Sequence, residues 1–108
     1  MTAQVSAPTD PRLIRLSPED NICAATTTIG AGESLLFEGR TILVADRIPT
    51  GHKMAVLPIG AGRHVIKYGA PIGSATRDIR PGEYVHTHNL KSDYLPTFTR
   101  EASSQYAQ

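Results

Sequence analysis

The feature that most constrains the fold of this 108-residue chain is the close spacing of Gly, Pro and Asp between short apolar segments. No stretch keeps an apolar period of 3.6 residues for three turns, which argues against long helices. Short alternating or β-branched segments between turn residues are typical of strands. We therefore predict an all-β fold with many turns. The expected strands are 12–16, 21–25, 34–37, 41–44, 54–57, 64–68 and 84–88.

A short pattern, Ile followed three positions later by Gly, recurs along the chain. The pairs are Ile29/Gly32, Ile48/Gly51, Ile59/Gly62 and Ile79/Gly82. We interpret this pattern as a repeated turn in which Ile is anchored in the core and Gly adopts a positive φ. Two similar halves that fold back on each other would result, although the spacing also arises by chance in a Gly-rich chain.

The length permits one domain. Residues 1–12 are polar and contain two prolines, so we expect a disordered extension there. Residues 13–95 are the expected folded domain. The stretch 96–108 is rich in Ser, Thr and Gln, and we expect a flexible tail or the stub of a linker.

Composition narrows the partners and the compartment. The net charge is +1, Lys and Arg are scattered and Trp is absent, so nucleic-acid binding is not expected. No apolar run approaches the roughly 20 residues of a membrane helix, and no secretion signal is recognisable. Cys23 is the only cysteine, which makes the cytoplasm the expected compartment. Its apolar surroundings favour a buried structural cysteine over a nucleophile.

Two histidines lie at the end of the last expected strand. His86 and His88 are two positions apart, so on a strand both side chains would point to the same face. Such a pair can bind one divalent metal, or divide into a ligand and an acid/base group. The same spacing fits two surface histidines on an edge strand. Two imidazoles are an incomplete metal site, so further ligands would have to come from elsewhere, including another chain.

Two lysines next to glycines are candidates for binding an acidic ligand. Lys53 and Lys67 could neutralise a carboxylate, and Tyr68 could donate a hydrogen bond to it. Solvated lysines and a half-buried strand tyrosine explain the same residues. The nearby acidic residues are explained by turn formation: Asp46, Asp78 and Glu83.

The run 51–89 contains Gly-His-Lys, Lys-Tyr-Gly, Ile-Gly-Ser-Ala-Thr and Val-His-Thr-His-Asn in this order. This ordered set resembles the N-terminal SAF domain of the altronate dehydratase and galactarate dehydratase family. Asp20, Asn21 and the segment 29–33 resemble the same domain more loosely. The resemblance implies a small SAF-type β-clip fold.

Members of that family remove water from hexonate or hexarate acids, which gives 2-keto-3-deoxy acids, and they depend on a divalent metal. The resemblance therefore implies the small subunit of a hydro-lyase that acts on a sugar acid together with a large catalytic subunit. It also implies Fe²⁺ or Mn²⁺ shared with that subunit. A truncated piece of a longer protein would look the same, and the sequence leaves a homo-oligomer open.

The resemblance points to particular residues without assigning their roles. On the chemistry of elimination, we expect His86 and His88 to bind the metal or transfer protons, and His52 to be a further acid/base group.

The substrate is expected to meet four other residues. Lys53 and Lys67 would clamp its carboxylate, while Tyr68 and Asn89 would orient its hydroxyl groups.

Two alternatives remain open from the sequence. One is the small subunit of a sulfolactate sulfo-lyase, a relative that expels sulfite instead of water. The other is a non-catalytic SAF module that binds a ligand or docks to a protein, because a fold does not imply an activity. The presence of both histidines together with Lys67 and Tyr68 argues against the module, since a β-clip needs none of them for packing.

Overall fold

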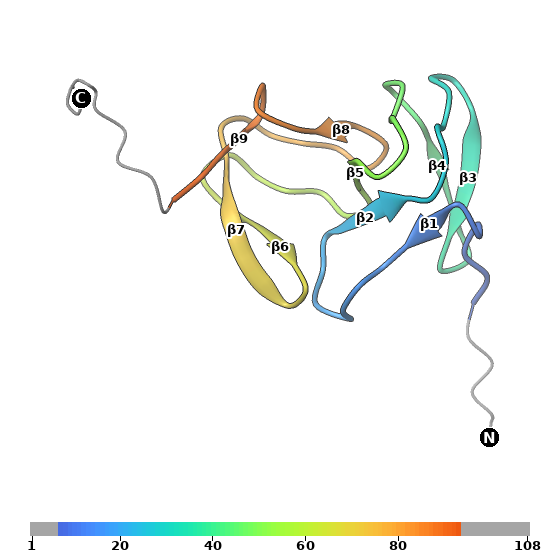
Figure 1. Ribbon diagram of the computed structural model, residues 1–108, viewed down its shortest axis with the longest axis horizontal. Helices are drawn as coiled ribbons and strands as arrows, with labels where there is room; N and C mark the ends of the chain where they lie inside the picture. The colour runs from blue at the N-terminus through green and yellow to red at the C-terminus, as the bar shows by residue number, and fades with distance from the viewer. Residues whose placement is uncertain (1–6, 94–108) are drawn as a thin grey trace.

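The structure, a computed structural model that describes residues 7–93, is built from strands and turns (Figure 1). No helix occurs in this part of the chain, so the all-β prediction is confirmed. The strands are β1 Leu13–Ile14, β2 Ile22–Ala25, β3 Ser34–Phe37, β4 Arg40–Leu43, β5 Lys53–Ala55, β6 His64–Lys67, β7 Ala70–Ala75, β8 Tyr84–Val85 and β9 Leu90–Lys91.

The strands form three antiparallel groups. A four-stranded sheet has the order β1-β2-β5-β8, the hairpin β3-β4 forms a second group, and β6-β7-β9 forms the third. Figure 1 shows the four-stranded sheet between the other two groups. Each face of this central sheet is therefore covered by a different hairpin.

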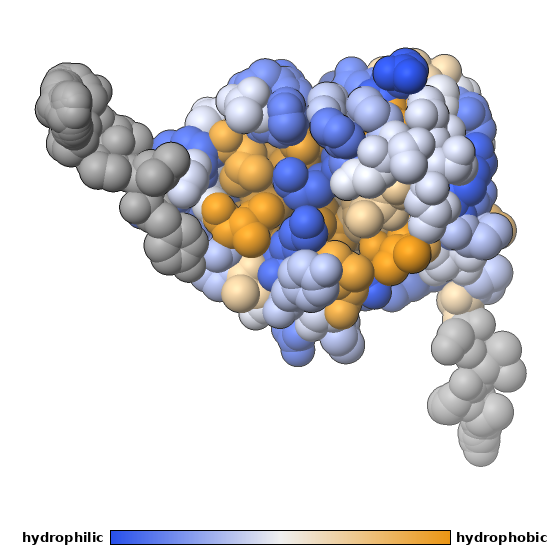
Figure 2. Space-filling view, in the orientation of Figure 1, coloured by the Kyte–Doolittle hydropathy of each residue, from blue (hydrophilic) through white to orange (hydrophobic). Residues whose placement is uncertain are grey.

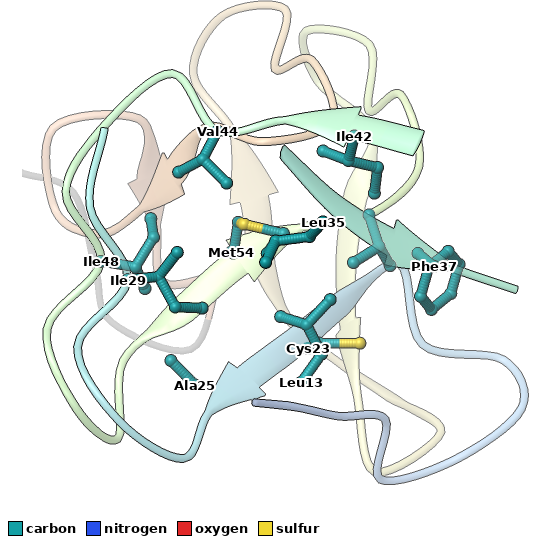
Figure 3. Close-up of a cluster of buried hydrophobic side chains, with 11 residues drawn as sticks. Leu13, Cys23, Ala25, Ile29, Leu35, Phe37, Ile42, Val44, Ile48 and Met54 are labelled. Carbon is teal, nitrogen blue, oxygen red and sulfur yellow. The ribbon is translucent and has the colours of Figure 1, made fainter. Parts of the chain in front are cut away.

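The two faces of the central sheet support two hydrophobic clusters, because successive side chains on a strand point to opposite faces. Met54 and Cys23, which pair across β5 and β2, face the cluster beneath β3-β4 (Figure 3). Ile22 and Ala55 face the cluster beneath β6-β7-β9. Each fully buried Ile, Leu or Phe contributes about 1.5–3 kcal/mol relative to an exposed one. The domain is thus held from both sides of one small sheet.

The repeated Ile-x-x-Gly pattern corresponds to a structural repeat. All four isoleucines are buried, and they pair as two isolated bridges, Ile29 with Ile48 and Ile59 with Ile79. All four glycines have positive φ: 89° at Gly32, 81° at Gly51, 82° at Gly62 and 95° at Gly82. The first bridge accompanies the hairpin β3-β4 and the second accompanies β6-β7. The interpretation as repeated turns in two similar halves is confirmed.

The structure corrects the strand prediction in several places. The strands expected at 12–16 and 54–57 are β1 Leu13–Ile14 and β5 Lys53–Ala55. The expected strand 84–88 ends at Val85, and residues 86–89 form a turn. Strands β7 and β9 were not expected: Pro71 and Gly73 disfavour a strand interior in β7, and β9 is only two residues long. Position 73 in β7 requires a glycine, because a Cβ there would overlap the backbone of Lys91 in β9.

Residues 8–12, which the sequence assigned to the extension, lie against the hairpin β3-β4. The Pro8 carbonyl accepts a hydrogen bond from the Gly39 amide at 2.9 Å, and the Asp10 amide donates to the Leu36 carbonyl at 2.8 Å. A hydrogen-bonded Arg12 side chain holds the pKa of Asp10 below its usual range. The rest of the expected extension and the expected tail, 1–6 and 96–108, lie outside the described residues.

The turn at Gly82 is expected to tolerate no side chain. A Cβ there would overlap the Leu43 carbonyl oxygen, whereas a Cβ at the equivalent Gly51 would meet nothing within 4 Å. Both glycines have positive φ, so Gly51→Ala should cost about 1–2 kcal/mol of unfolding free energy through backbone strain alone. Gly82→Ala should cost at least about 3 kcal/mol because overpacking is added. Urea unfolding of both variants measures the difference in unfolding free energy. Equal losses for Gly51→Ala and Gly82→Ala would contradict the close contact between Gly82 and the Leu43 carbonyl oxygen.

Candidate functional site

Four aromatic rings gather at the end of strands β5 and β8, with Tyr84 at their centre. The Tyr84 ring lies 5.6 Å from that of His52, 5.3 Å from His86 and 5.7 Å from His88, measured between centroids. Tyr84 and His86 are nearly parallel, at 8°. His52 is also 5.5 Å from His86. The structure therefore brings together all three histidines of the predicted site, around a tyrosine that the sequence analysis did not single out.

The closest polar contact in this ring cluster joins His52 and Tyr84. The His52 Nδ1 and the Tyr84 hydroxyl are 2.6 Å apart, and the tautomer of the imidazole decides which group donates. Tyr84 is anchored on its backbone, because its amide donates to the Asp46 carboxylate at 3.0 Å. The pair can pass a proton between an imidazole and a phenol. Its only signal in the sequence is the position of Tyr84 two residues before His86.

The turn that carries His86 and His88 is held by Asn89. The Asn89 Oδ1 accepts from the His86 amide at 2.9 Å, and its Nδ2 donates to the Tyr84 carbonyl at 2.8 Å. The side chain is fully buried. Since both of its polar groups are used inside the domain, Asn89 does not reach a substrate hydroxyl as the sequence analysis expected. It positions the two histidines instead.

The turn also changes the interpretation of the histidine pair as a metal site. His86 and His88 both contact Tyr84, but they do not share a strand face, because the strand ends before them. Within residues 7–93, no group of three or more His, Cys, Asp or Glu side chains is arranged to hold a metal ion. The donor set in this part of the chain is thus insufficient for a complete metal centre.

Lys53 lies on the opposite face of the central sheet from Tyr84. It is half-buried and stands in register with Ile14 and Ala24 through β2 and with Val85 on β8. Burial lowers the pKa of Lys53, and the positive charge of Lys67 lowers it further. In the described residues neither lysine forms an ion pair with a carboxylate. Two uncompensated cations therefore lie near each other on this side.

The residues that pair with Lys53 across the sheet are apolar: Ala24 on β2 and Val85 on β8. Ile14, in the same register row, is exposed. In Figure 2 hydrophobic residues lie on both sides of a hydrophilic strip in the middle of the view, between the β7 side and the β1-β2 side. An ammonium group beside apolar surface is poorly hydrated, which strengthens its attraction for an anion.

Lys67 and Tyr68 are at the tip of the hairpin β6-β7. The Lys67 Nζ lies 5.7 Å from the centroid of the Tyr68 ring, within range of a cation–π interaction. The Tyr68 side chain is 69% exposed. The Tyr68 ring is thus presented to solvent, and the half-buried Lys67 lies beside it.

The ring cluster and Lys53 are adjacent in the chain at the end of the β5-β8 pair. His52 directly precedes Lys53, and His86 directly follows Val85, which pairs with Lys53. The described contacts include none between a lysine and a histidine of this site. A ligand that contacts both Lys53 and the ring cluster would have to reach both faces of the sheet.

Cys23 is excluded as a nucleophile. It is fully buried, and burial raises the pKa of its thiol to about 12.

No helix long and apolar enough to cross a membrane is found among the described residues.

Lys53 is expected to lower the stability of the free domain. Its pKa is lowered on folding, so the unfolded chain binds more protons below pH 10.5 and stability rises as the pH increases towards that value. Lys53→Met keeps the apolar stem without the charge, so it should raise the melting temperature at pH 7 and remove this rise. Thermal unfolding between pH 7 and 10 measures both, with Lys91→Met as the matched control because Lys91 on β9 is exposed. A lower melting temperature for Lys53→Met would contradict the inference that the Lys53 charge is partly buried without a compensating carboxylate.

Comparison with known proteins places this chain in a family. A model described as the altronate/galactarate dehydratase SAF domain matches residues 11–93. Altronate dehydratase from Bacillus subtilis is 41% identical over 80 residues, which is 74% of this chain and 16% of that protein. The Escherichia coli altronate dehydratase is 35% identical over the same share of each.

A shorter relative is also similar. The (2R)-sulfolactate sulfo-lyase subunit alpha from Chromohalobacter salexigens is 47% identical over 49 residues, 45% of this chain and 52% of that subunit. The chain thus spans about a sixth of the altronate dehydratases and about half of the sulfo-lyase subunit. The match over 11–93 covers nearly all described residues, and the chain belongs to the altronate/galactarate dehydratase SAF domain family.

Proposed function

We propose that this domain is the small component of a hydro-lyase that dehydrates a sugar acid of the altronate or galactarate type to a 2-keto-3-deoxy acid. It acts with a large catalytic subunit, in the cytoplasm, where an unpaired Cys23 stays reduced. The observation that carries the proposal is the ring cluster, in which His52 and Tyr84 share a 2.6 Å hydrogen bond beside His86. The names of the relatives support the reaction class.

The elimination needs a base and an acid. In the proposed reaction, a base removes the proton α to the carboxylate, the electron pair forms a carbon–carbon double bond, and the β C–O bond breaks. The leaving hydroxyl takes a proton and departs as water, and the enol product converts to the keto acid. His52, His86 and His88 are the proposed proton carriers. Tyr84 holds the His52 imidazole through its hydroxyl and stacks on His86.

The lysines are proposed to bind the acidic end of the substrate. Removing the α proton builds negative charge on the carboxylate, and a cation fixed nearby stabilises that charge. Lys53 and Lys67 are without a carboxylate partner within 7–93, so no internal ion pair has to break when the substrate binds. Tyr68, exposed next to Lys67, supplies a ring and a hydroxyl to the same end of the substrate.

A divalent metal enters the proposal only as a shared group. Fe²⁺ or Mn²⁺ would assist departure of the hydroxyl as a Lewis acid. His86 and His88 can supply at most two of its ligands, because the described residues hold no larger donor cluster. The remaining ligands are assigned to the large subunit.

One other lyase has specific support. The similarity to a sulfo-lyase subunit alpha favours a chain of this size acting as one subunit of a larger enzyme, with sulfite rather than water as the leaving group. A domain that only binds a sugar acid or docks to a protein, alone or as a homo-oligomer, remains the alternative without catalysis.

Reconstitution tests the proposal. The chain is mixed with a large dehydratase-like partner and Fe²⁺ or Mn²⁺, and keto-acid or sulfite release is followed on aldonic, aldaric and sulfonated hydroxy acids. We expect turnover of a sugar acid by the mixture only. His86→Ala should lower kcat by a factor of about 10²–10⁴, the usual contribution of one general acid or base. His64→Ala is the matched control, because His64 lies on β6 outside the ring cluster and should leave kcat unchanged.

Three results would contradict the proposal. A well-formed complex that turns over none of the substrates would favour the binding or docking module. Equal kcat for wild type and His86→Ala would remove His86 from the acid/base chemistry. Sulfite release without water loss would instead favour the sulfo-lyase.

A further inference from the structure

The turn that presents Lys67 and Tyr68 has an unfavourable backbone conformation. Tyr68 has φ of 57° and Gly69 has φ of 73°. Positive φ at two consecutive positions is typical of the tightest hairpin turns, where Asn or Gly normally occupies the first position. A tyrosine at that position is strained. Some other contact must therefore stabilise the turn.

That contact is the side chain of Asp20. Its Oδ2 accepts from the Tyr68 amide at 3.0 Å and its Oδ1 accepts from the Gly69 amide at 2.8 Å. Asp20 is fully buried, so water does not compete for these bonds. The Asp20 carbonyl is itself fixed, because the Arg15 guanidinium donates to it at 2.8 and 3.0 Å.

The neighbouring Asn21 fixes the strand that leads into the turn. Its Oδ1 accepts from the Ile66 amide at 2.8 Å, and its Nδ2 donates to the His64 carbonyl at 3.1 Å. Asp20 and Asn21 together therefore attach the entry of β2 to the edge and tip of the hairpin β6-β7.

The equivalent turn in the other half gives an internal comparison. Glu38 and Gly39 have φ of 48° and 80°. There the Glu38 amide donates to the Thr9 hydroxyl, and the Gly39 amide donates to the Pro8 carbonyl, both at 2.9 Å. Both turns thus have their two amides paired, but a buried carboxylate serves only the turn that carries Tyr68.

We propose that Asp20 is a positioning residue for ligand binding. It holds Tyr68 in the left-handed conformation, which keeps the ring exposed beside the Lys67 ammonium so that both meet the same acidic group of the substrate. This inference rests on the proposed function, because it assigns Asp20 to the anion-binding end of that site. Asp20 itself does not touch the substrate, because it is buried beneath the turn.

The test combines ligand titration with kinetics. Galactarate is titrated into the full ¹⁵N-labelled chain, free and in the reconstituted complex, while the Tyr68 and Gly69 amide signals are followed. Asp20→Asn replaces one accepting oxygen with an NH₂ group, so it should expose the Tyr68 or Gly69 amide to faster hydrogen exchange. We expect the galactarate Kd and the KM to rise about tenfold with kcat nearly unchanged, as for the loss of uniform binding.

Two further variants separate positioning from stability. Thr9→Val removes the corresponding cap of the Glu38 turn, so it should lower the melting temperature and leave Kd and KM unchanged. Asparagine adopts the left-handed conformation readily, so Tyr68→Asn should keep the fold but remove the ring and raise KM. The two variants therefore distinguish a loose fold from a misplaced binding group.

The outcomes for the positioning role and for the lyase differ. If Asp20→Asn exposes the amides but leaves Kd and KM at wild-type values, the positioning role is wrong and the lyase can stand. A wild-type chain whose Tyr68 signal never responds to galactarate overturns the positioning role as well. Galactarate binding that depends on Asp20, in a complex without turnover, supports the positioning role and contradicts the lyase.

Discussion

The central four-stranded sheet depends on being covered on both faces at once. Ile22 and Ala55 pack on one side and Cys23 and Met54 on the other, although each strand is only a few residues long. Strands this short make few ladder hydrogen bonds, so the burial of apolar side chains has to supply the stability. The chain achieves this by using one turn-and-hairpin unit twice, once for each face.

That arrangement also places the candidate functional groups. Tyr84 and Lys53 start from adjacent strands, but the alternation of a strand directs them to opposite faces. The rings occupy the side of β3-β4 and the lysines the side of β6-β7. His52 and Lys53 are adjacent in the chain, so we propose the end of the β5-β8 pair as the place where one ligand contacts both faces. A domain with this layout offers groups to a site but does not enclose it, which agrees with a role beside a larger subunit.

Local patterns in the sequence predicted much of this. Turn residues between short apolar segments were sufficient for the all-β class, and the Ile-x-x-Gly spacing was sufficient for the repeated turns with their positive φ. The error at His86 and His88 has a physical origin. The strand ends because Asn89 turns the chain back, and its hydrogen bonds to Tyr84 and His86 are side-chain contacts that no alternation pattern reveals.

The most consequential contact was also the least local. Asp20 meets Tyr68 and Gly69 at a sequence separation of nearly fifty residues. In the sequence it was only part of a loose resemblance, because an aspartate before a strand is usually explained by a turn. Tyr84 was missed for a related reason, since its position two residues before His86 does not by itself reveal the contact with His52. The contacts of both residues form only when segments distant in the sequence pair in the fold.

We propose that the end of the β5-β8 pair contributes to one ligand site from both faces of the sheet. The most direct measurement is a galactarate titration of the assembled enzyme, with isotope labels in the histidine rings and the lysine ammonium groups. We expect the signals of His52, His86 and Lys53 to shift together, with one half-saturation concentration. Shifts confined to the lysines, with unchanged histidine signals, would contradict it and separate the two faces into unrelated sites.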